Sequence, residues 1–130
     1  MEITIDTSAI ISVITNEQSK EKIVYLSKGC DLIAPNSVHW EIGNALSAMI
    51  KRERANLSQA KKCLSAYGQI PIKYVEADLT QSIELVSSLK IYAYDAYLVR
   101  CALEFGTPLL TLDSGLKYAA GRVGVEVLEV

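Results

Sequence analysis

Short aliphatic runs, each bounded by polar or turn residues, alternate with longer helical stretches along this 130-residue chain. Aliphatic runs of four to six residues are typical of strands buried on both faces of a parallel sheet. Parallel neighbours need long, right-handed crossover connections, which are usually helical. The alternation therefore predicts an α/β fold, a three-layer α/β/α sandwich with a five-stranded, mainly parallel sheet.

The predicted elements follow one another without a linker, an internal repeat or a low-complexity tract. We predict strands over 2–5, 31–34, 72–75, 109–112 and 125–130. We predict helices over 8–16, 17–27, 37–54, 58–67, 78–90, 94–105 and 114–120. The polar stretch between the third and fourth helices is predicted to be a turn, with Asn56 and Ser58 as its break and cap.

Length and composition favour one domain that spans residues 1–130. Half of the residues are apolar and 22% are charged, with seven Gly and three Pro, which excludes a disordered tail, a collagen-like repeat and a coiled-coil rod. Thirteen basic residues against fifteen acidic ones give a net charge of −2. The chain therefore has no global positive field, and a nucleic-acid partner would require a local basic strip.

Cysteine usage and the N-terminal stretch predict a cytoplasmic protein without a membrane partner. The three cysteines are widely spaced and form no CxxC pair, which argues against a disulfide framework and a zinc cluster. The first fifteen residues include Glu2 and Asp6 and lack the basic region of a signal peptide. No apolar run approaches the length that a bilayer requires.

Two aspartates directly follow predicted strands: Asp6 after 2–5, and Asp113 after 109–112. In open α/β sheets, ligands bind in the crevice beyond the carboxyl ends of the strands. Asp is also a favoured N-cap, and taken singly each aspartate is better explained as the cap of the following helix.

Two further acids lie on predicted helices. Asp95 shares a helix face with Leu98, Val99 and Ala102, which places a carboxylate on the buried stripe in the first turn. The helix N-terminus favours its ionised form by about 0.3–1 kcal/mol, less than full desolvation costs, so a positive partner is expected nearby. Glu41 falls on the shoulder of an apolar helix face; taken alone, it is better explained as a solvated flank residue.

If the first and fourth predicted strands are neighbours, the acids that follow them come together, and the four acids then jointly predict a cation site. Carboxylates crowded at one sheet edge repel one another, and a bound cation makes the arrangement tolerable. Oxygen ligands without His or Cys select a hard divalent ion, Mg²⁺ or Mn²⁺, over zinc. Such an ion is suited to activating a water for in-line attack on a phosphodiester.

Four stretches surround these acids: DTSAII from Asp6, WEIGNAL from Trp40, YDAYL from Tyr94 and TLDSGL from Thr111. In order, they resemble the four acidic motifs of PIN-domain ribonucleases, and the resemblance covers nearly the whole chain. Size and motif spacing are most similar to the VapC-type toxins of toxin–antitoxin pairs. Each motif alone is weak, but four in the right order on the right kinds of element make a strong signal.

The resemblance implies the PIN-like sheet order 3-2-1-4-5, which places the first and fourth strands side by side. It implies that four acids are catalytic and hold one or two Mg²⁺ or Mn²⁺ ions: Asp6, Glu41, Asp95 and Asp113. It also implies that three hydroxyl side chains support the acids by orienting carboxylates or waters: Thr7, Ser8 and Thr111. For each of them, an ordinary structural role at a helix start or in a strand is at least as good an explanation.

The activity implied by the resemblance is metal-dependent endonucleolytic cleavage of RNA that leaves a 5′-phosphate and a 3′-hydroxyl. The implied partners are the RNA substrate, a cognate antitoxin protein and a second copy of the chain in a homodimer. The cations that would hold RNA are not obvious. One basic group surrounds the predicted turn (Lys51, Arg52, Arg54, Lys61, Lys62), and a second lies nearer the acids in sequence (Arg100, Lys117, Arg122).

His39 and several aromatic residues lie near the acids in sequence, and each could have a structural or a functional role. His39 is expected to be structural, since a triad or zinc site would need partners that the chain lacks. Trp40 would mark a subunit or antitoxin contact, or else cover a neighbouring helix. Three tyrosines would stack on bases or fill the rim of the crevice: Tyr92, Tyr94 and Tyr97.

Three other functions compete with a ribonuclease. A non-catalytic PIN-fold module would bind RNA or a protein, but a binder has no reason to crowd carboxylates where phosphates dock. A phosphoacceptor module of the receiver type needs an aspartate after the third strand, where Glu76 stands, and a lysine after the fifth. A phosphatase of the haloacid dehalogenase type needs a second aspartate at position 8, where Ser8 stands.

Overall fold

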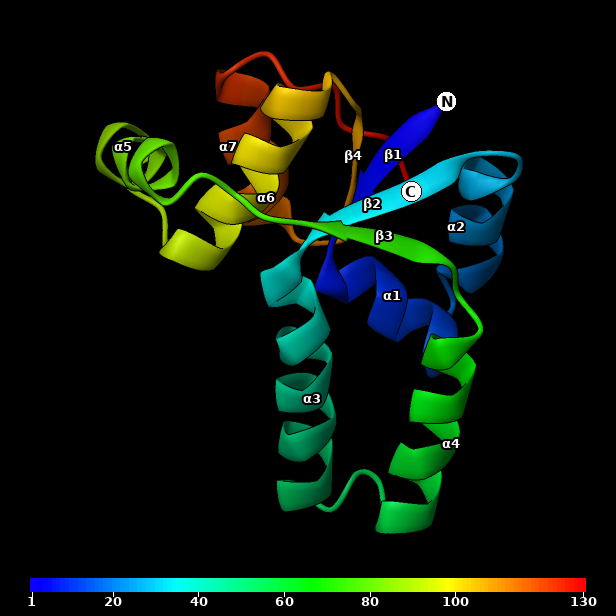
Figure 1. Cartoon of the computed structure of the whole chain (residues 1–130). Helices are drawn as coiled ribbons and strands as arrows, with labels where there is room; N and C mark the ends of the chain where they lie inside the picture. Colours follow the sequence, from blue (N-terminus) through cyan, green and yellow to red (C-terminus); the bar gives the residue numbers. More distant parts are fainter.

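The computed structural model describes residues 1–130 and contains a four-stranded parallel sheet in the order β3-β2-β1-β4 (Figure 1). The strands are β1 (Glu2–Ile5), β2 (Asp31–Pro35), β3 (Ile72–Val75) and β4 (Leu109–Leu110). Thr4 of β1 pairs with Ile33 on one side and Leu109 on the other. The predicted three-layer fold and the first four positions of the predicted order are confirmed.

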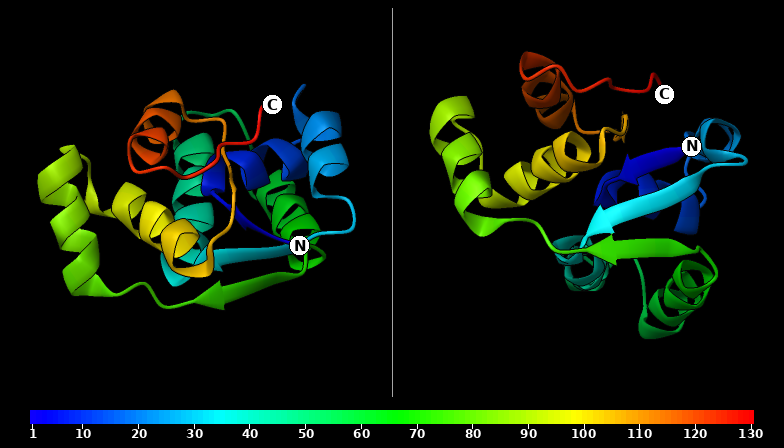
Figure 2. Two further views of the ribbon diagram at one scale, coloured as in Figure 1. Left: turned by 90° about the horizontal axis from the view of Figure 1, so that it is seen from above. Right: turned by 45° about the horizontal axis from the view of Figure 1, so that its top comes forward.

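The chain has seven helices, and helices lie on both faces of the sheet (Figures 1 and 2). In Figure 1, α1, α3 and α4 lie below the sheet, whereas α6 and α7 lie above it, with α5 beside α6. None of the helices is both long enough and apolar enough to cross a bilayer. Their bounds are α1 (Thr7–Ile14), α2 (Lys20–Ser27), α3 (Asn36–Lys51), α4 (Leu57–Gly68), α5 (Leu79–Leu89), α6 (Ala93–Phe105) and α7 (Ser114–Arg122).

The core forms around β1, whose residues Ile3, Thr4 and Ile5 are all buried although successive side chains point to opposite faces. Helices therefore pack against both sides of this strand, as the sequence pattern predicts for a central parallel strand. In α3, Val38, Ile42 and Leu46 repeat every four residues and are buried, which fixes the face that this helix turns toward the sheet.

The predicted fifth strand over 125–130 is wrong. This segment runs beside β4 but makes a single parallel bridge, Val127 to Leu109. Leu109 N–H donates to the Glu126 carbonyl at 2.8 Å, and its carbonyl accepts from Leu128 N–H at 3.0 Å. Strand β4 ends at Leu110, two residues earlier than predicted, so only Leu109 turns its backbone groups toward this segment.

Two helix ends also differ from prediction because the backbone turns through the left-handed region. Asn16, at φ 56°, separates α1 from α2, which begins at Lys20 rather than at residue 17. Glu53, at φ 58°, lies just beyond α3, which ends at Lys51 rather than at residue 54. Such φ values are uncommon outside glycine and mark the points where helical backbone cannot continue.

The predicted turn before α4 is stabilised by a capping box. The Asn56 side chain accepts from Gln59 N–H at 2.8 Å, and the Gln59 side chain accepts from Asn56 N–H at 2.9 Å. Of the two residues proposed for this turn, Asn56 is the cap and Ser58 lies inside the helix.

Replacing Asn56 by Ala should lower the free energy of unfolding by about 1 kcal/mol, because it leaves the Gln59 N–H at the start of α4 without its acceptor. Urea unfolding followed by circular dichroism measures the change. Asn44→Ala, at an exposed position inside α3, is the control and should cause no loss, since Ala is the better helix former. Equal midpoints for Asn56→Ala and the native chain would contradict the role of the cap.

Candidate functional site

Asp6 ends β1 and is almost completely buried, with 5% of its surface exposed. Its Oδ1 accepts from Ser8 Oγ at 2.8 Å and from Ala9 N–H at 3.2 Å, and its Oδ2 accepts from Thr111 Oγ1 at 2.6 Å. Burial raises the pKa of this carboxyl and the charge of Asp113 adds to the effect, whereas the three hydrogen bonds oppose it. Both carboxyl oxygens are therefore oriented by neighbouring donors.

Ser8 and Thr111 connect the ends of β1 and β4. Ser8 Oγ, besides donating to Asp6, accepts from Leu112 N–H at 2.9 Å. Thr111 Oγ1 accepts from Asp113 N–H at 3.0 Å. The side chains expected to orient carboxylates thus contact Asp6 directly and hold the backbone that carries Asp113.

Asp113 is the third residue after β4 and caps α7, where its Oδ1 accepts from Leu116 N–H at 3.1 Å. Asp6 caps α1 in the same way. The interpretation of both residues as helix caps is therefore confirmed. A carboxylate has about four lone-pair positions on its two oxygens, so capping one helix leaves acceptor capacity for another partner.

Glu41 lies in the second turn of α3 and is half-buried. Burial, followed by the charges of Asp6 and Asp95, raises its pKa to about 7. The Thr7 hydroxyl acts weakly in the opposite direction, because it approaches the carboxyl without a well-formed hydrogen bond. Thr7 Oγ1 and Glu41 Oε1 are both buried and have no hydrogen-bond partner.

Asp95, in the first turn of α6, completes the group of acids. Its pKa is raised by burial and then by the charge of Asp113. The charges thus link the acids in a closed ring of four pairs: Asp6 with Asp113, Asp6 with Glu41, Glu41 with Asp95, and Asp95 with Asp113. Four elements distant in sequence bring their carboxylates to one edge of the sheet.

The donor chemistry of this acidic ring fits a hard divalent cation. All four side chains offer carboxylate oxygens, and the unpartnered Glu41 Oε1 is a buried acceptor that still needs a positive partner. As they stand, the side chains form no group of three or more acidic, His or Cys residues that could hold a metal ion. The ring therefore supplies the ligand type, and its side chains would have to close on the ion.

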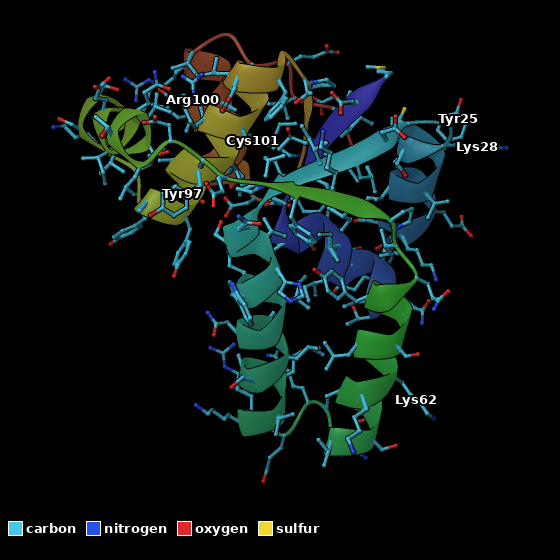
Figure 3. The ribbon with its side chains drawn as sticks, viewed as in Figure 1. Tyr25, Lys28, Lys62, Tyr97, Arg100 and Cys101 are labelled. Carbon is cyan, nitrogen blue, oxygen red and sulfur yellow. The ribbon has the colours of Figure 1, made fainter.

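The basic residues singled out from the sequence lie on several different elements. Lys62 lies on α4, in the arm that α3 and α4 form below the sheet, far from Tyr97 of α6 (Figure 3). Arg100 lies further along α6 than Tyr97, and its buried Nε has no hydrogen-bond partner. Arg122 contacts the Leu89 carbonyl and the Tyr118 ring.

The aromatic residues of α3 lie outside the ring. His39 is exposed rather than partly buried, and its Nδ1 lies 2.9 Å from the Tyr67 hydroxyl, which in turn contacts the Tyr74 hydroxyl. Trp40 is 73% exposed and stacks edge-on against His39. The structural interpretation of His39 therefore agrees with these contacts.

Ser37 was not expected from the sequence to lie near the ring. It precedes Glu41 by four residues, so the two side chains share one face of α3. Its buried Oγ has no hydrogen-bond partner. The i, i+4 spacing was the available signal.

Fold and acidic ring together define an α/β/α protein with carboxylates gathered at the carboxyl edge of a parallel sheet. The family model of the PIN domain matches residues 3–122, and the chain therefore belongs to the PIN domain family. None of the curated proteins compared with the chain matches it.

Several solved structures share this fold. PAE2754 from Pyrobaculum aerophilum is 21% identical with a TM-score of 0.72, over 92% of this chain and 86% of that one. VapBC2 from Rickettsia felis, bound to a DNA fragment from their promoter, is 16% identical with a TM-score of 0.70, and the match covers 99% of this chain and 98% of that one. VapC20 from Mycobacterium tuberculosis, a sarcin–ricin loop cleaving toxin, is 13% identical with a TM-score of 0.66, and the match covers 98% of this chain and 99% of that one. At these identities the likeness shows the fold alone.

The raised pKa of Glu41 predicts a stability difference that depends on pH in metal-free buffer. At pH values between the ordinary pKa of a glutamate and about 7, Glu41 keeps its proton in the folded chain and loses it in the unfolded chain. The free energy of unfolding therefore falls as the pH rises through this range. Glu41→Gln removes the effect. Relative to the native chain, its urea midpoint should therefore be higher at about pH 8 than at about pH 4.5.

Urea unfolding in the presence of a chelator measures this difference. Glu84→Gln, an exposed position on α5, is the control and should follow the native chain at both pH values. A Glu41→Gln variant that shows the same pH dependence as the native chain would refute the described environment of Glu41.

Proposed function

We propose that this PIN-domain protein is a metal-dependent endoribonuclease and that residues 1–130 act as one PIN-like domain. The observation that carries the proposal is the acidic ring, in which each carboxylate is coupled to two others and a buried Glu41 oxygen lacks a partner. Such crowding serves no structural purpose that a neutral residue would not serve better. Cation binding explains it.

The chain's own residues have distinct roles in this proposal. Asp6, Glu41, Asp95 and Asp113 hold one or two Mg²⁺ or Mn²⁺ ions. Such an ion, when bound, activates a water and offsets the charge of the phosphodiester. Ser8 and Thr111 keep both Asp6 oxygens oriented. The Thr7 hydroxyl, which has no hydrogen-bond partner, would orient Glu41 or a water.

The reaction is hydrolysis. The oxygen of a water forms a bond to phosphorus while the bond to the 3′-oxygen breaks in line. The leaving 3′-oxygen gains a proton, and the products are a 5′-phosphate and a 3′-hydroxyl. An ion held by these acids would lower the pKa of the water, so no side chain outside the acidic ring would have to act as a base.

We further propose that the protein is the toxin of a VapBC-type toxin–antitoxin pair, with an antitoxin protein and a second copy of itself as partners. Similarity to VapBC2 and to VapC20, a toxin that cleaves the sarcin–ricin loop, supports the assignment. Large apolar side chains exposed on α4 and α5 offer surface that partner proteins would cover: Leu57, Leu64, Leu79 and Ile83.

Asp95→Asn should lower the rate of RNA cleavage at least about 100-fold. Replacing a residue that only supports a metal ligand costs about 10–100-fold in activity, and replacing the metal ligand itself should cost more. Cleavage of a labelled RNA in the presence of Mn²⁺ measures the rate. Expression of the native chain should also arrest bacterial growth, and expression of Asp95→Asn should not. Asp95 accepts no structural hydrogen bond, which makes it a cleaner test than Asp6.

Glu84→Gln is the matched control and should retain the full cleavage rate. Cleavage by Asp95→Asn at the native rate would contradict the assignment of the acidic ring. A native chain that binds RNA without cutting it in Mg²⁺ or Mn²⁺ would favour the alternative, a non-catalytic PIN-fold binding module.

Mn²⁺ binding should stabilise the folded chain, since an ion that binds only the folded state raises its stability by about 2.7 kcal/mol at a hundredfold excess over Kd. Calorimetric titration and thermal unfolding should both detect binding at millimolar Mn²⁺. Asp95→Asn should lose most of the shift and Glu84→Gln should keep it. A native chain without a shift would refute the metal site independently of any RNA substrate.

A further inference from the structure

A cavity of about 300 Å³ lies beside the acidic ring, at the carboxyl ends of β2 and β3. The first turn of α3 forms one wall through Pro35 and Ser37. The segment after β3 forms another through Glu76 and Leu79, and Tyr97 of α6 closes the third. This volume is at the lower end of the range for small-molecule sites, roughly 300–1,000 Å³, and suits a single flat ring system. We call it the β2–β3 cavity.

Helix α3 connects the β2–β3 cavity to the acidic ring. Ser37 lies one turn before Glu41 on the same face of α3, a separation of about 5–6 Å between Cβ atoms. Tyr97 follows Asp95 by two residues in α6, so these two side chains point in different directions around that helix. A group that contacts Ser37 therefore lies about one helical turn from Glu41.

The β2–β3 cavity combines apolar walls with a few polar groups. Pro35, Leu79 and the Tyr97 ring are apolar surfaces, and Tyr97 is braced by an edge-on contact with Tyr94 at 5.9 Å between ring centroids. Ser37 Oγ is buried without a hydrogen-bond partner. A buried hydroxyl without a partner is unusual, and a ligand in the cavity would supply one.

The lining favours a nucleotide base over a phosphate. No Lys or Arg lines the cavity, and the Glu76 carboxylate repels an anion. A base is neutral and flat, with two apolar faces and a polar edge, so it matches an aromatic wall beside hydroxyl and carboxylate acceptors. Carboxylates accept hydrogen bonds from amino groups of bases.

We propose that the β2–β3 cavity binds one base of the RNA next to the cleaved phosphodiester and selects bases that carry an amino group. The inference rests on the proposed ribonuclease function. Tyr97 stacks on the base, Ser37 Oγ bonds to its polar edge, and Glu76 accepts from the amino group of adenine, cytosine or guanine. Uracil presents a carbonyl oxygen in place of the amino group and is disfavoured.

Mapping of cut sites in an RNA with randomised sequence tests this preference. The native chain should select against uracil at one position beside the cut bond. Tyr97→Ala should weaken cleavage about 10-fold through a higher KM, because it removes the stacking surface, and Tyr97→Phe should restore it. Glu76→Gln should relax the discrimination against uracil at that same position and change the rate little with the other bases.

Tyr25→Ala is the matched control, since Tyr25 is 73% exposed on α2, on the opposite side of the molecule from Tyr97 (Figure 3). It should keep the native rate and base preference. A native chain that cuts RNA without base preference, or a Glu76→Gln variant that retains the native preference, would overturn the inference while leaving the ribonuclease assignment intact.

Nucleoside binding tests the cavity without any cleavage. Adenosine and cytidine at millimolar concentration should shift the backbone amide NMR signals of Ser37 and Ala77, and uridine should shift them less. Tyr97→Ala should lose these shifts and Tyr25→Ala should keep them. Absence of shifts with every nucleoside overturns the inference, whereas shifts in a chain that cuts no RNA support the cavity and refute the ribonuclease.

Discussion

The hydrogen bond between Thr111 and Asp6 is the interaction on which the site depends. It joins the end of β4 to the end of β1 at 2.6 Å, and the same hydroxyl accepts from Asp113 N–H. One side chain thereby sets the position of two carboxylates that stand 107 residues apart. Strand β4 ends at Leu110, one residue before Thr111, and this short strand explains why the C-terminal segment pairs through Leu109 alone.

Electrostatic repulsion in the acidic ring is compensated unevenly. Asp6 accepts three hydrogen bonds, and Asp113 accepts one from α7. Asp95 accepts no hydrogen bond, and one Glu41 oxygen is buried without a donor. Burial and the charges of Asp6 and Asp95 raise the pKa of Glu41 to about 7. The hydrogen bonds to the ring are therefore concentrated on the β1–β4 side, and the carboxylates of α3 and α6 are the ones that a cation would stabilise most.

The sequence was sufficient for the parts of the fold that depend on local pattern. Aliphatic runs located β1, β2 and β3, and the acids after two strands were found because parallel strands direct their carboxyl ends to one edge. That Glu41 and Asp95 lie near this edge could be predicted only from the family resemblance, because local sequence periodicity does not determine how helices pack against a sheet. The segment 125–130 has the pattern of a strand, yet its pairing depends on the length of β4. Ser37 was overlooked because an unpartnered hydroxyl is visible only when its surroundings are known.

Helix α3 couples the acidic ring to the β2–β3 cavity. Val38 and Ile42 are buried against the sheet and fix the rotation of the helix about its own axis. Ser37 and Glu41 each precede one of these residues, so they form an adjacent stripe about 100° around the helix. Because both stripes belong to one rigid element, the apolar contacts that build the core also determine where Ser37 Oγ and the Glu41 carboxylate lie relative to each other. A repacked core would therefore move both together, and the separation between a bound base and the acids would be preserved.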